Sequence, residues 1–133
     1  KAFDQVIYAC GKIRRNGQSG TWITQDVFDG YTELHRLGIA HSVEVWEGKD
    51  LVGGLYGVDA GGVFCGESMF HLRSDASKMA FLHLVEHLKN RGATWLDIQV
   101  MTPHFEILGA KEIPRNDFLD KLEHTLAKKL KIF

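Results

Sequence analysis

Hydrophobic positions in the first third of the chain follow a helical period. Residues 3–13 repeat apolar side chains every three or four positions, which predicts an amphipathic helix that stops at the loop-forming stretch 16–20. A second helix is expected after Thr24, a suitable N-cap, and is predicted to end at Gly38. The apolar face of this second helix contains Val27, Tyr31 and Leu34.

Three further helices are predicted in the second half of the chain. Ser74 or Asp75 is expected to cap the first of them, and residues 102–108 fit a short helix. The last helix is expected after Pro114, with Asn116 as its N-cap. The predicted apolar stripes contain Met79, Leu82, Val85 and Leu88 in the first of these helices and Phe118, Leu122, Leu126 and Leu130 in the last.

Between the second and third helices the period changes to two, which is typical of strands. Residues 42–47, 51–58 and 63–70 are separated by short turns and predict an antiparallel three-strand meander. Residues 95–101 predict a buried strand that pairs in parallel with a neighbour, and residues 111–113 predict another short strand. The expected fold class is α/β, a single sandwich of one mixed, mainly antiparallel sheet and flanking helices.

Two of these strands carry acidic residues at positions where a buried strand would be apolar. Asp97 and Gln99 alternate with apolar residues and would share one face. In the third strand of the meander, Glu67 is expected to share a face with Cys65 and Met69. Each acid fits an exposed sheet face, and also a cleft in which a carboxylate and an amide bind a substrate amine.

Glycine and histidine patterns leave alternatives open. Gly53, Gly54 and Gly57 fit either a close approach of another segment or a tight meander. His83 and His87 match the His-x-x-Glu-His pattern of some zinc peptidases, but an accidental pair on a solvated helix is the favoured interpretation and no metal is expected. The chain contains no P-loop, no Gly-x-Ser-x-Gly elbow and no Cys-x-x-Cys pair, so three common enzyme classes lack motif support.

The composition fits one domain in the cytoplasm. The 133 residues are 44% hydrophobic, enough for a single core, and no apolar run approaches the roughly 20 residues of a membrane span. Two cysteines fit a reducing compartment. Sixteen Lys and Arg against seventeen Asp and Glu give a net charge of −1, so a nucleic-acid partner would need a local basic patch. Two candidate patches end the first and last helices: Lys12, Arg14 and Arg15, and Lys128, Lys129 and Lys131.

Several blocks of sequence resemble one known family. The most specific is Phe64-Cys65-Gly66-Glu67-Ser68-Met69-Phe70; others are Thr21-Trp22-Ile23-Thr24, residues 38–46, residues 51–58, Asp97-Ile98-Gln99-Val100, Leu108-Gly109-Ala110 and Ile113-Pro114-Arg115. In colinear order over nearly the whole chain, they resemble the leucyl/phenylalanyl-tRNA–protein transferases. The resemblance implies the fold of the GCN5-related N-acetyltransferases. It also implies that residues 1–133 form the single catalytic domain, without the family's N-terminal domain.

The resemblance implies an aminoacyltransferase. Leu or Phe would move from the 3' end of its aminoacyl-tRNA to the α-amine of a protein that begins with Lys or Arg, a mark for N-end-rule degradation. Asp97 and Gln99 correspond to the family's catalytic pair, and Glu67 to an acid that favours a cationic acceptor. No cofactor is expected, because residues 72–77 lack the glycines with which acetyltransferases bind coenzyme A. The implied substrate-binding residues are Trp22, beside the site, and an apolar pocket of Leu55, Phe64, Met69, Phe81 and Leu84.

Three positions depart from the family pattern: His71, Thr102 and Ile107. They leave open a divergent, catalytically impaired homologue that binds peptide N-termini or aminoacyl-adenosine, and a further alternative is an N-acetyltransferase. The leading hypothesis is a cytoplasmic aminoacyltransferase domain, either truncated or naturally short.

Overall fold

The computed structural model describes residues 2–13 and 20–133, so most of the predicted loop 16–20 and the cations Arg14 and Arg15 lie outside the described residues. Two helices come first: α1 (Phe3–Lys12) and α2 (Gln25–Arg36). Three strands follow: β1 (Ala40–Glu47), β2 (Asp50–Asp59) and β3 (Phe64–His71). The second half is helical, with α3 (Ala76–Asn90), α4 (Pro103–Ile107) and α5 (Arg115–Ala127). Among the described residues, no helix has the length and apolar character needed to cross a membrane.

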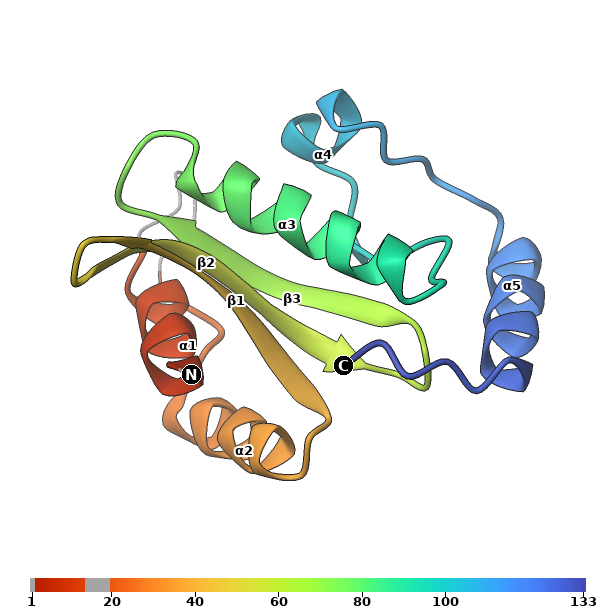
Figure 1. Ribbon diagram of the computed structural model, residues 1–133, viewed down its shortest axis with the longest axis horizontal. Helices are drawn as coiled ribbons and strands as arrows, with labels where there is room; N and C mark the ends of the chain where they lie inside the picture. Colours follow the sequence, from red (N-terminus) through yellow and green to blue (C-terminus); the bar gives the residue numbers. More distant parts are fainter. Residues whose placement is uncertain (1, 14–19) are drawn as a thin grey trace.

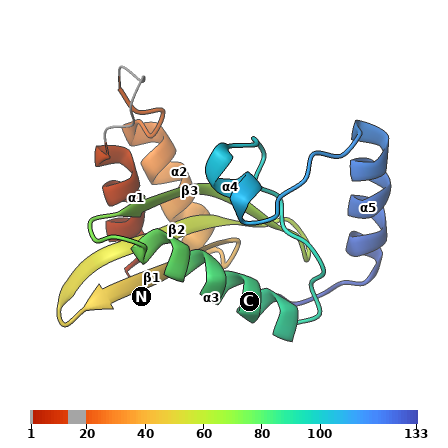
Figure 2. The ribbon, with the colours of Figure 1, turned by 90° about the horizontal axis from the view of Figure 1, so that it is seen from above.

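The predicted meander is confirmed as a three-strand antiparallel sheet with the order β1-β2-β3. Helices α1 and α2 cover one face of the sheet and α3 covers the other (Figure 1), while α5 stands at one end of the molecule (Figure 2). Each face therefore has its own buried cluster. The α1–α2 side contains Phe3, Val6, Ile7, Cys10, Ala40, Tyr56 and Phe70, and the α3 side contains Leu55, Phe64, Ala80, Leu84, Leu88, Ala93 and Ile132.

Helix starts agree with the sequence only in part. Thr24 caps α2 as predicted, since its Oγ1 accepts a hydrogen bond of 3.4 Å from the Val27 amide. Asp75 occupies the N-cap position of α3, but it has a φ of 62° and makes no side-chain cap bond. The prediction of Asn116 as N-cap of α5 is wrong, because the helix already begins after Pro114. Proline suits a helix start, because its own fixed φ is helical and it needs no amide donor there.

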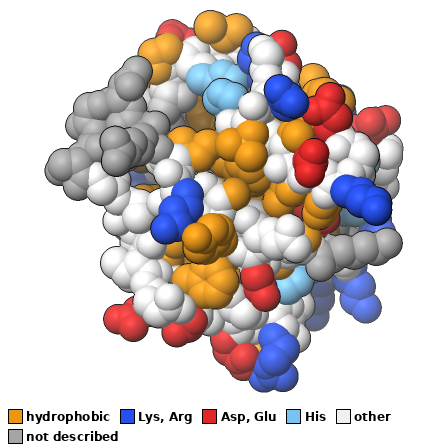
Figure 3. Space-filling model, turned by 90° about the vertical axis from the view of Figure 1, so that its left-hand side faces the viewer, with side chains coloured by type: hydrophobic (Ala, Val, Ile, Leu, Met, Phe, Trp, Pro, Cys, Tyr) orange, Lys and Arg blue, Asp and Glu red, His pale blue; other side chains and the backbone are white. Residues whose placement is uncertain are grey.

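The predicted apolar stripe of α3 is right only at its end, where Leu88 is buried. Met79 and Leu82 are 60% and 59% exposed, whereas Leu84 and the small Ala76 and Ala80 face the sheet. The reason is a close approach: a Cβ on Gly53 of β2 would lie 2.5 Å from the Ala76 Cβ. Only small residues fit at that contact, so the helix turns larger ones outward. Figure 3 shows the face at this end of the sheet, with hydrophobic side chains gathered across its middle and charged side chains around them.

The two strands predicted after α3 do not form. Residues 111–113 have no strand structure, and residues 95–101 make a single parallel bridge, between Asp97 and Cys65 of β3. The segment leaves the sheet because the Gln99 amide donates to Asp97 Oδ1 at 2.7 Å and Gln99 has a φ of 64°. This local turn competes with strand pairing. The fold is therefore a mixed α/β structure with one three-strand antiparallel sheet and flanking helices.

Candidate functional site

A β-bulge in β3 determines the position of Glu67. Tyr56 of β2 pairs with Ser68, and the next residue, Gly57, pairs with Gly66, so Glu67 has no partner in β2. A bulge bends its strand and redirects the extra side chain, and bulges often lie beside functional sites. Glu67 is therefore released from the regular alternation of β3.

The bulge also changes which face of the sheet the β3 side chains point to, so residues before it and after it no longer follow one alternation. Cys65 pairs with Val58, which packs in the cluster under α1 and α2, whereas Met69 pairs with Leu55 in the cluster under α3. The prediction that Cys65, Glu67 and Met69 share one face is therefore wrong. A strict period of two cannot continue through an inserted residue.

The bulge and the turn after Asp97 bring the three predicted polar residues together. Asp97 is fixed to β3 by its main chain: its amide donates to the Phe64 carbonyl at 2.9 Å, and its carbonyl accepts from the Gly66 amide at 2.8 Å. Gln99 then links the two acids, because its amide donates to Asp97 Oδ1 at 2.7 Å and its Nε2 donates to Glu67 Oε1 at 3.2 Å. The predicted pair of acids and the amide form one hydrogen-bonded cluster.

Tyr31, on α2, belongs to the same cluster, although the sequence marked it only as part of a helical stripe. Burial, the negative charge of Glu67 and a hydrogen bond to Glu67 raise the pKa of the Tyr31 phenol to about 12. The phenol is therefore a neutral donor at physiological pH. The predicted Trp22 packs edge-on against this ring, with centroids 6.4 Å apart and planes at 75°.

Cys65 is a neighbour of the carboxylates of Asp97 and Glu67, and its thiol is unsuited to act as a nucleophile. Burial and the neighbouring Asp97 and Glu67 charges raise the pKa of its thiol to about 11. A thiol nucleophile must reach the thiolate state near neutral pH. The chemistry that this cluster supports is therefore hydrogen bonding and proton transfer by the carboxylates, the amide and the phenol.

The five residues predicted to form an apolar pocket lie in one hydrophobic cluster between the sheet and α3. Leu55, Phe64 and Leu84 are buried, and Met69 and Phe81 are half-buried at its margin. Phe105 of α4, which sequence reasoning did not select, packs against the Phe81 ring at a centroid distance of 5.5 Å. Met69 follows Glu67 by two residues, so the apolar and the polar cluster lie at the same stretch of β3, with Met69 on the α3 side of the sheet.

The three positions that depart from the family pattern have distinct surroundings. Thr102 caps α4 by accepting a 3.3 Å hydrogen bond from the Phe105 amide, a role that asparagine also fills. His71 Nδ1 lies 3.4 Å from Ser77 Oγ. Ile107 is 87% exposed at the end of α4.

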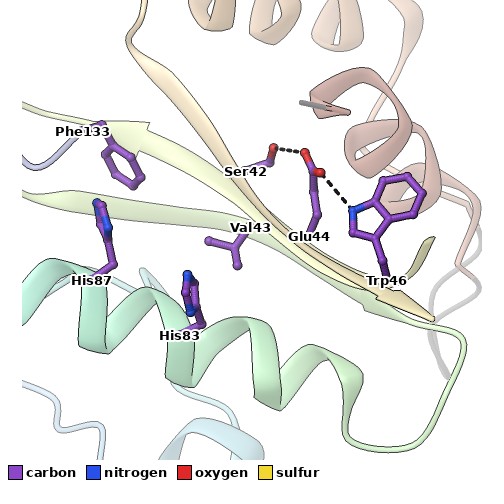
Figure 4. Close-up of a pocket in the computed structure, with 7 residues that line it drawn as sticks. All are labelled: Ser42, Val43, Glu44, Trp46, His83, His87 and Phe133. Carbon is purple, nitrogen blue, oxygen red and sulfur yellow. Dashed lines mark hydrogen bonds between the residues drawn. The ribbon is translucent and has the colours of Figure 1, made fainter. Parts of the chain in front are cut away.

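A separate cavity of about 460 Å³ lies between β1 and α3 (Figure 4), and none of the predicted site residues lines it. The two histidines of the His-x-x-Glu-His pattern, His83 and His87, contribute to its wall. His87 is engaged with the C-terminal segment, because its Nε2 lies 2.6 Å from the Ile132 carbonyl oxygen and its ring stacks on Phe133 at 4.9 Å. Within residues 2–13 and 20–133, no three His, Cys, Asp or Glu side chains gather as metal ligands.

The fold and the candidate site define an α/β domain in which a hydrogen-bonded acidic cluster and an apolar cluster lie at the same stretch of β3. Comparison with known proteins identifies its relatives. The model of the family "leucyl/phenylalanyl-tRNA protein transferase" matches residues 1–123, and the chain belongs to this family, as its sequence blocks indicated.

Similar proteins carry the same family name. The leucyl/phenylalanyl-tRNA–protein transferase of Pseudoalteromonas atlantica is 52% identical over 95% of this chain and 53% of its own length. That of Chlorobaculum tepidum is 52% identical over 96% of this chain and 66% of its own length, and that of Shewanella denitrificans is 56% identical over 92% and 51%. The chain thus spans about half to two-thirds of the length of these curated relatives.

Proposed function

We propose that this chain carries the acyl-transfer site of a leucyl/phenylalanyl-tRNA–protein transferase. The donor is leucine or phenylalanine esterified to the 3' end of its tRNA, and the acceptor is the α-amine of a protein that begins with Lys or Arg. The observation that carries this proposal is Gln99: its side chain bonds to Glu67 while its backbone amide bonds to Asp97, which is fixed to β3 beside the apolar cluster. Family membership supports the same activity.

The reaction needs an amine without its extra proton and a polarised ester. The ammonium first gives one proton to a base, which releases it to solvent. The neutral amine nitrogen then forms a bond to the ester carbonyl carbon, the bond from that carbon to the ribose oxygen breaks, and the departing oxygen takes the second proton that the nitrogen loses. Asp97 is the group we assign to hold the ammonium and take its proton, since a carboxylate is a suitable general base. Gln99 is neutral and donates through Nε2 to Glu67, so we assign its Oε1 to orienting the amine. Cys65 remains a thiol, so transfer is direct.

The apolar cluster supports a hydrophobic aminoacyl group. Leu55, Phe64 and Leu84 form its floor, while Met69 and Phe81 are accessible at its margin. An apolar pocket rejects polar side chains strongly but separates similar hydrophobic ones by only about 1–3 kcal/mol. Use of both Leu and Phe follows from such a pocket.

Glu67 supports the preference for a cationic acceptor. It lies at the bulge beside Gln99, so its charge stands next to the position proposed for the incoming amine. Opposite charges about 4 Å apart attract by about 1–4 kcal/mol in polar surroundings. An acceptor that begins with Lys or Arg places a second cation within reach of this carboxylate.

Transfer to two peptides tests the proposal. Glu67→Gln is expected to lower transfer to a Lys-initiated peptide at least tenfold, and transfer to an Ala-initiated peptide much less. Glu47→Gln is the matched control, because Glu47 is an exposed acid on β1 that pairs with Arg73. Equal transfer by Glu67→Gln and the control would contradict the role of Glu67, and no transfer by the unaltered protein to any peptide would contradict the function.

We also propose that residues 1–133 form one domain with the GCN5-related N-acetyltransferase arrangement. The parallel bridge between Asp97 and Cys65 supports this, because it continues the sheet beyond β3 after a crossover through α3. A crystal structure with substrate bound is expected to show residues 95–98 beside β3. A structure in which this segment lies away from the sheet would overturn the assignment.

A further inference from the structure

Five cations from two distant parts of the chain meet where α3 ends. Lys89 and Arg91 lie at the C-terminal end of α3, and three lysines follow α5, where the chain returns to the sheet (Figure 1). We call these five residues the cationic corner. Its tail members are Lys128, Lys129 and Lys131.

Packing of the tail against the sheet and α3 holds the corner together. A Cβ on Gly92, just after α3, would lie 3.7 Å from Leu130 Cδ2, and one on Gly62 would lie 3.1 Å from Leu130 Cβ. His87 Nε2 lies 2.6 Å from the Ile132 carbonyl oxygen, and the Ile132 side chain is fully buried. The lysines on both sides of Leu130 are therefore held, in space, beside the end of α3 that carries Lys89 and Arg91.

The corner concentrates positive charge in a chain that is otherwise acidic. Residues 87–96 and 126–133 contain the five cations and no Asp or Glu, which leaves eleven Lys and Arg against seventeen Asp and Glu elsewhere. All five are exposed, and within the part of the chain that the structure describes none of them lies within ion-pair distance of an acid. The ion pairs between described residues engage Arg36, Arg73 and Lys78 instead.

We propose that the cationic corner binds the phosphates of an RNA strand whose 3' end lies at Asp97. This inference rests on the proposed function. Arg91 precedes Asp97 by six residues, so this end of the corner lies at most ~22 Å from the site, since an extended chain spans about 3.3–3.6 Å per residue. A strand with one charge per roughly 3.4 Å places about six phosphates over that distance. A net-negative chain thus presents its unpaired positive charge on the path of the donor.

Binding of a short RNA hairpin with a single-stranded 3' end tests the inference. The variant Lys128→Gln/Lys129→Asn/Lys131→Gln removes the tail charges, and asparagine is used at 129 because that residue has a φ of 49°. Each lost phosphate contact lowers the slope of log affinity against log salt by about 0.7–0.9, so the slope is expected to fall by about 2–3. A drop of tenfold or more in RNA affinity at low salt is expected.

A matched variant removes the same number of charges elsewhere. Arg36→Gln/Arg73→Gln/Lys78→Gln removes three cations that are each paired with an acid and do not belong to the corner, so it is expected to keep the salt slope. Puromycin, an aminoacyl-adenosine analogue without a stem, is expected to bind all three proteins equally. Its binding decides whether the proposed site exists, independently of the corner.

The outcomes separate cleanly. A reduced salt slope in the tail variant alone, with puromycin binding unchanged, supports the inference. Equal RNA binding by both variants, or no RNA binding by the unaltered chain, overturns it even if puromycin binds. Oligoglutamate serves as a second ligand. If the tail variant loses as much affinity for oligoglutamate as it loses for RNA, the inference is also overturned, because the corner would then be a surface for acidic proteins.

Discussion

Replacing Asp97 separates its charge from its structural role. Asp97→Asn keeps the Oδ1 atom that accepts from the Gln99 amide at 2.7 Å but removes the charge, whereas Asp97→Ala removes both. Transfer should fall about 10²–10⁴-fold in both variants, the usual contribution of a general base. Only Asp97→Ala should lose stability, by about 1 kcal/mol for one hydrogen bond, because Gln99 then has no partner for its left-handed turn.

Two measurements on the same preparations check this separation. Urea unfolding gives the free energy of unfolding, and a loss of ~1 kcal/mol corresponds to a melting temperature about 4 °C lower in a chain of this size. Single-turnover transfer to a Lys-initiated peptide gives the rate of the chemical step. Wild-type transfer by Asp97→Asn would refute the role of the charge, and unchanged stability of Asp97→Ala would refute the role of the turn.

Three further predictions follow from packing and titration. Gly57→Ala should lower the free energy of unfolding, measured by urea denaturation, by about 1–3 kcal/mol, because the added Cβ would lie 2.6 Å from the Phe64 ring. Gly30→Ala is the control: its added Cβ meets no atom within 4 Å, so this variant should be neutral or stabilising. The Cys65 thiol, with a pKa raised to about 11, should react with iodoacetamide far more slowly at pH 8 than a free thiol, and a normal rate would contradict its burial beside two acids. Ultraviolet difference titration should show the Tyr31 phenol ionising near pH 12. Because the folded-state pKa of this phenol is raised above its unfolded value, the stability that the neutral phenol contributes should be complete below pH 10 and lost as the pH rises towards 12.

Local chemistry in the sequence was sufficient for the first half of the fold. The helical period of residues 3–13, the Thr24 cap and the three-strand meander of residues 42–70 depend on neighbours along the chain, and all three are confirmed. The stripe of α3 depends instead on how closely Gly53 allows the helix to approach the sheet. That distance depends on tertiary packing, so helical periodicity alone misplaced Met79 and Leu82.

The candidate site shows the same division. Asp97, Gln99 and Glu67 were selected from strand patterns and from the family resemblance, and they do meet. The reason given for Asp97 and Gln99 was wrong, because the two residues are joined by a turn and not by a shared strand face. Tyr31 was missed because its hydroxyl reaches Glu67 from another element, and no pattern within α2 signals that contact.

The bulge at Glu67 explains how one strand serves two chemically different environments. Without the inserted residue, β3 would keep a strict alternation, and Met69 and Phe64 could not both face α3. With it, Phe64 and Met69 both pack in the apolar cluster under α3 while Glu67 between them turns to Gln99. Deleting Glu67 should therefore do more than remove a carboxylate: it should rotate one half of β3 out of the core and unfold the chain, whereas Glu67→Gln should fold normally.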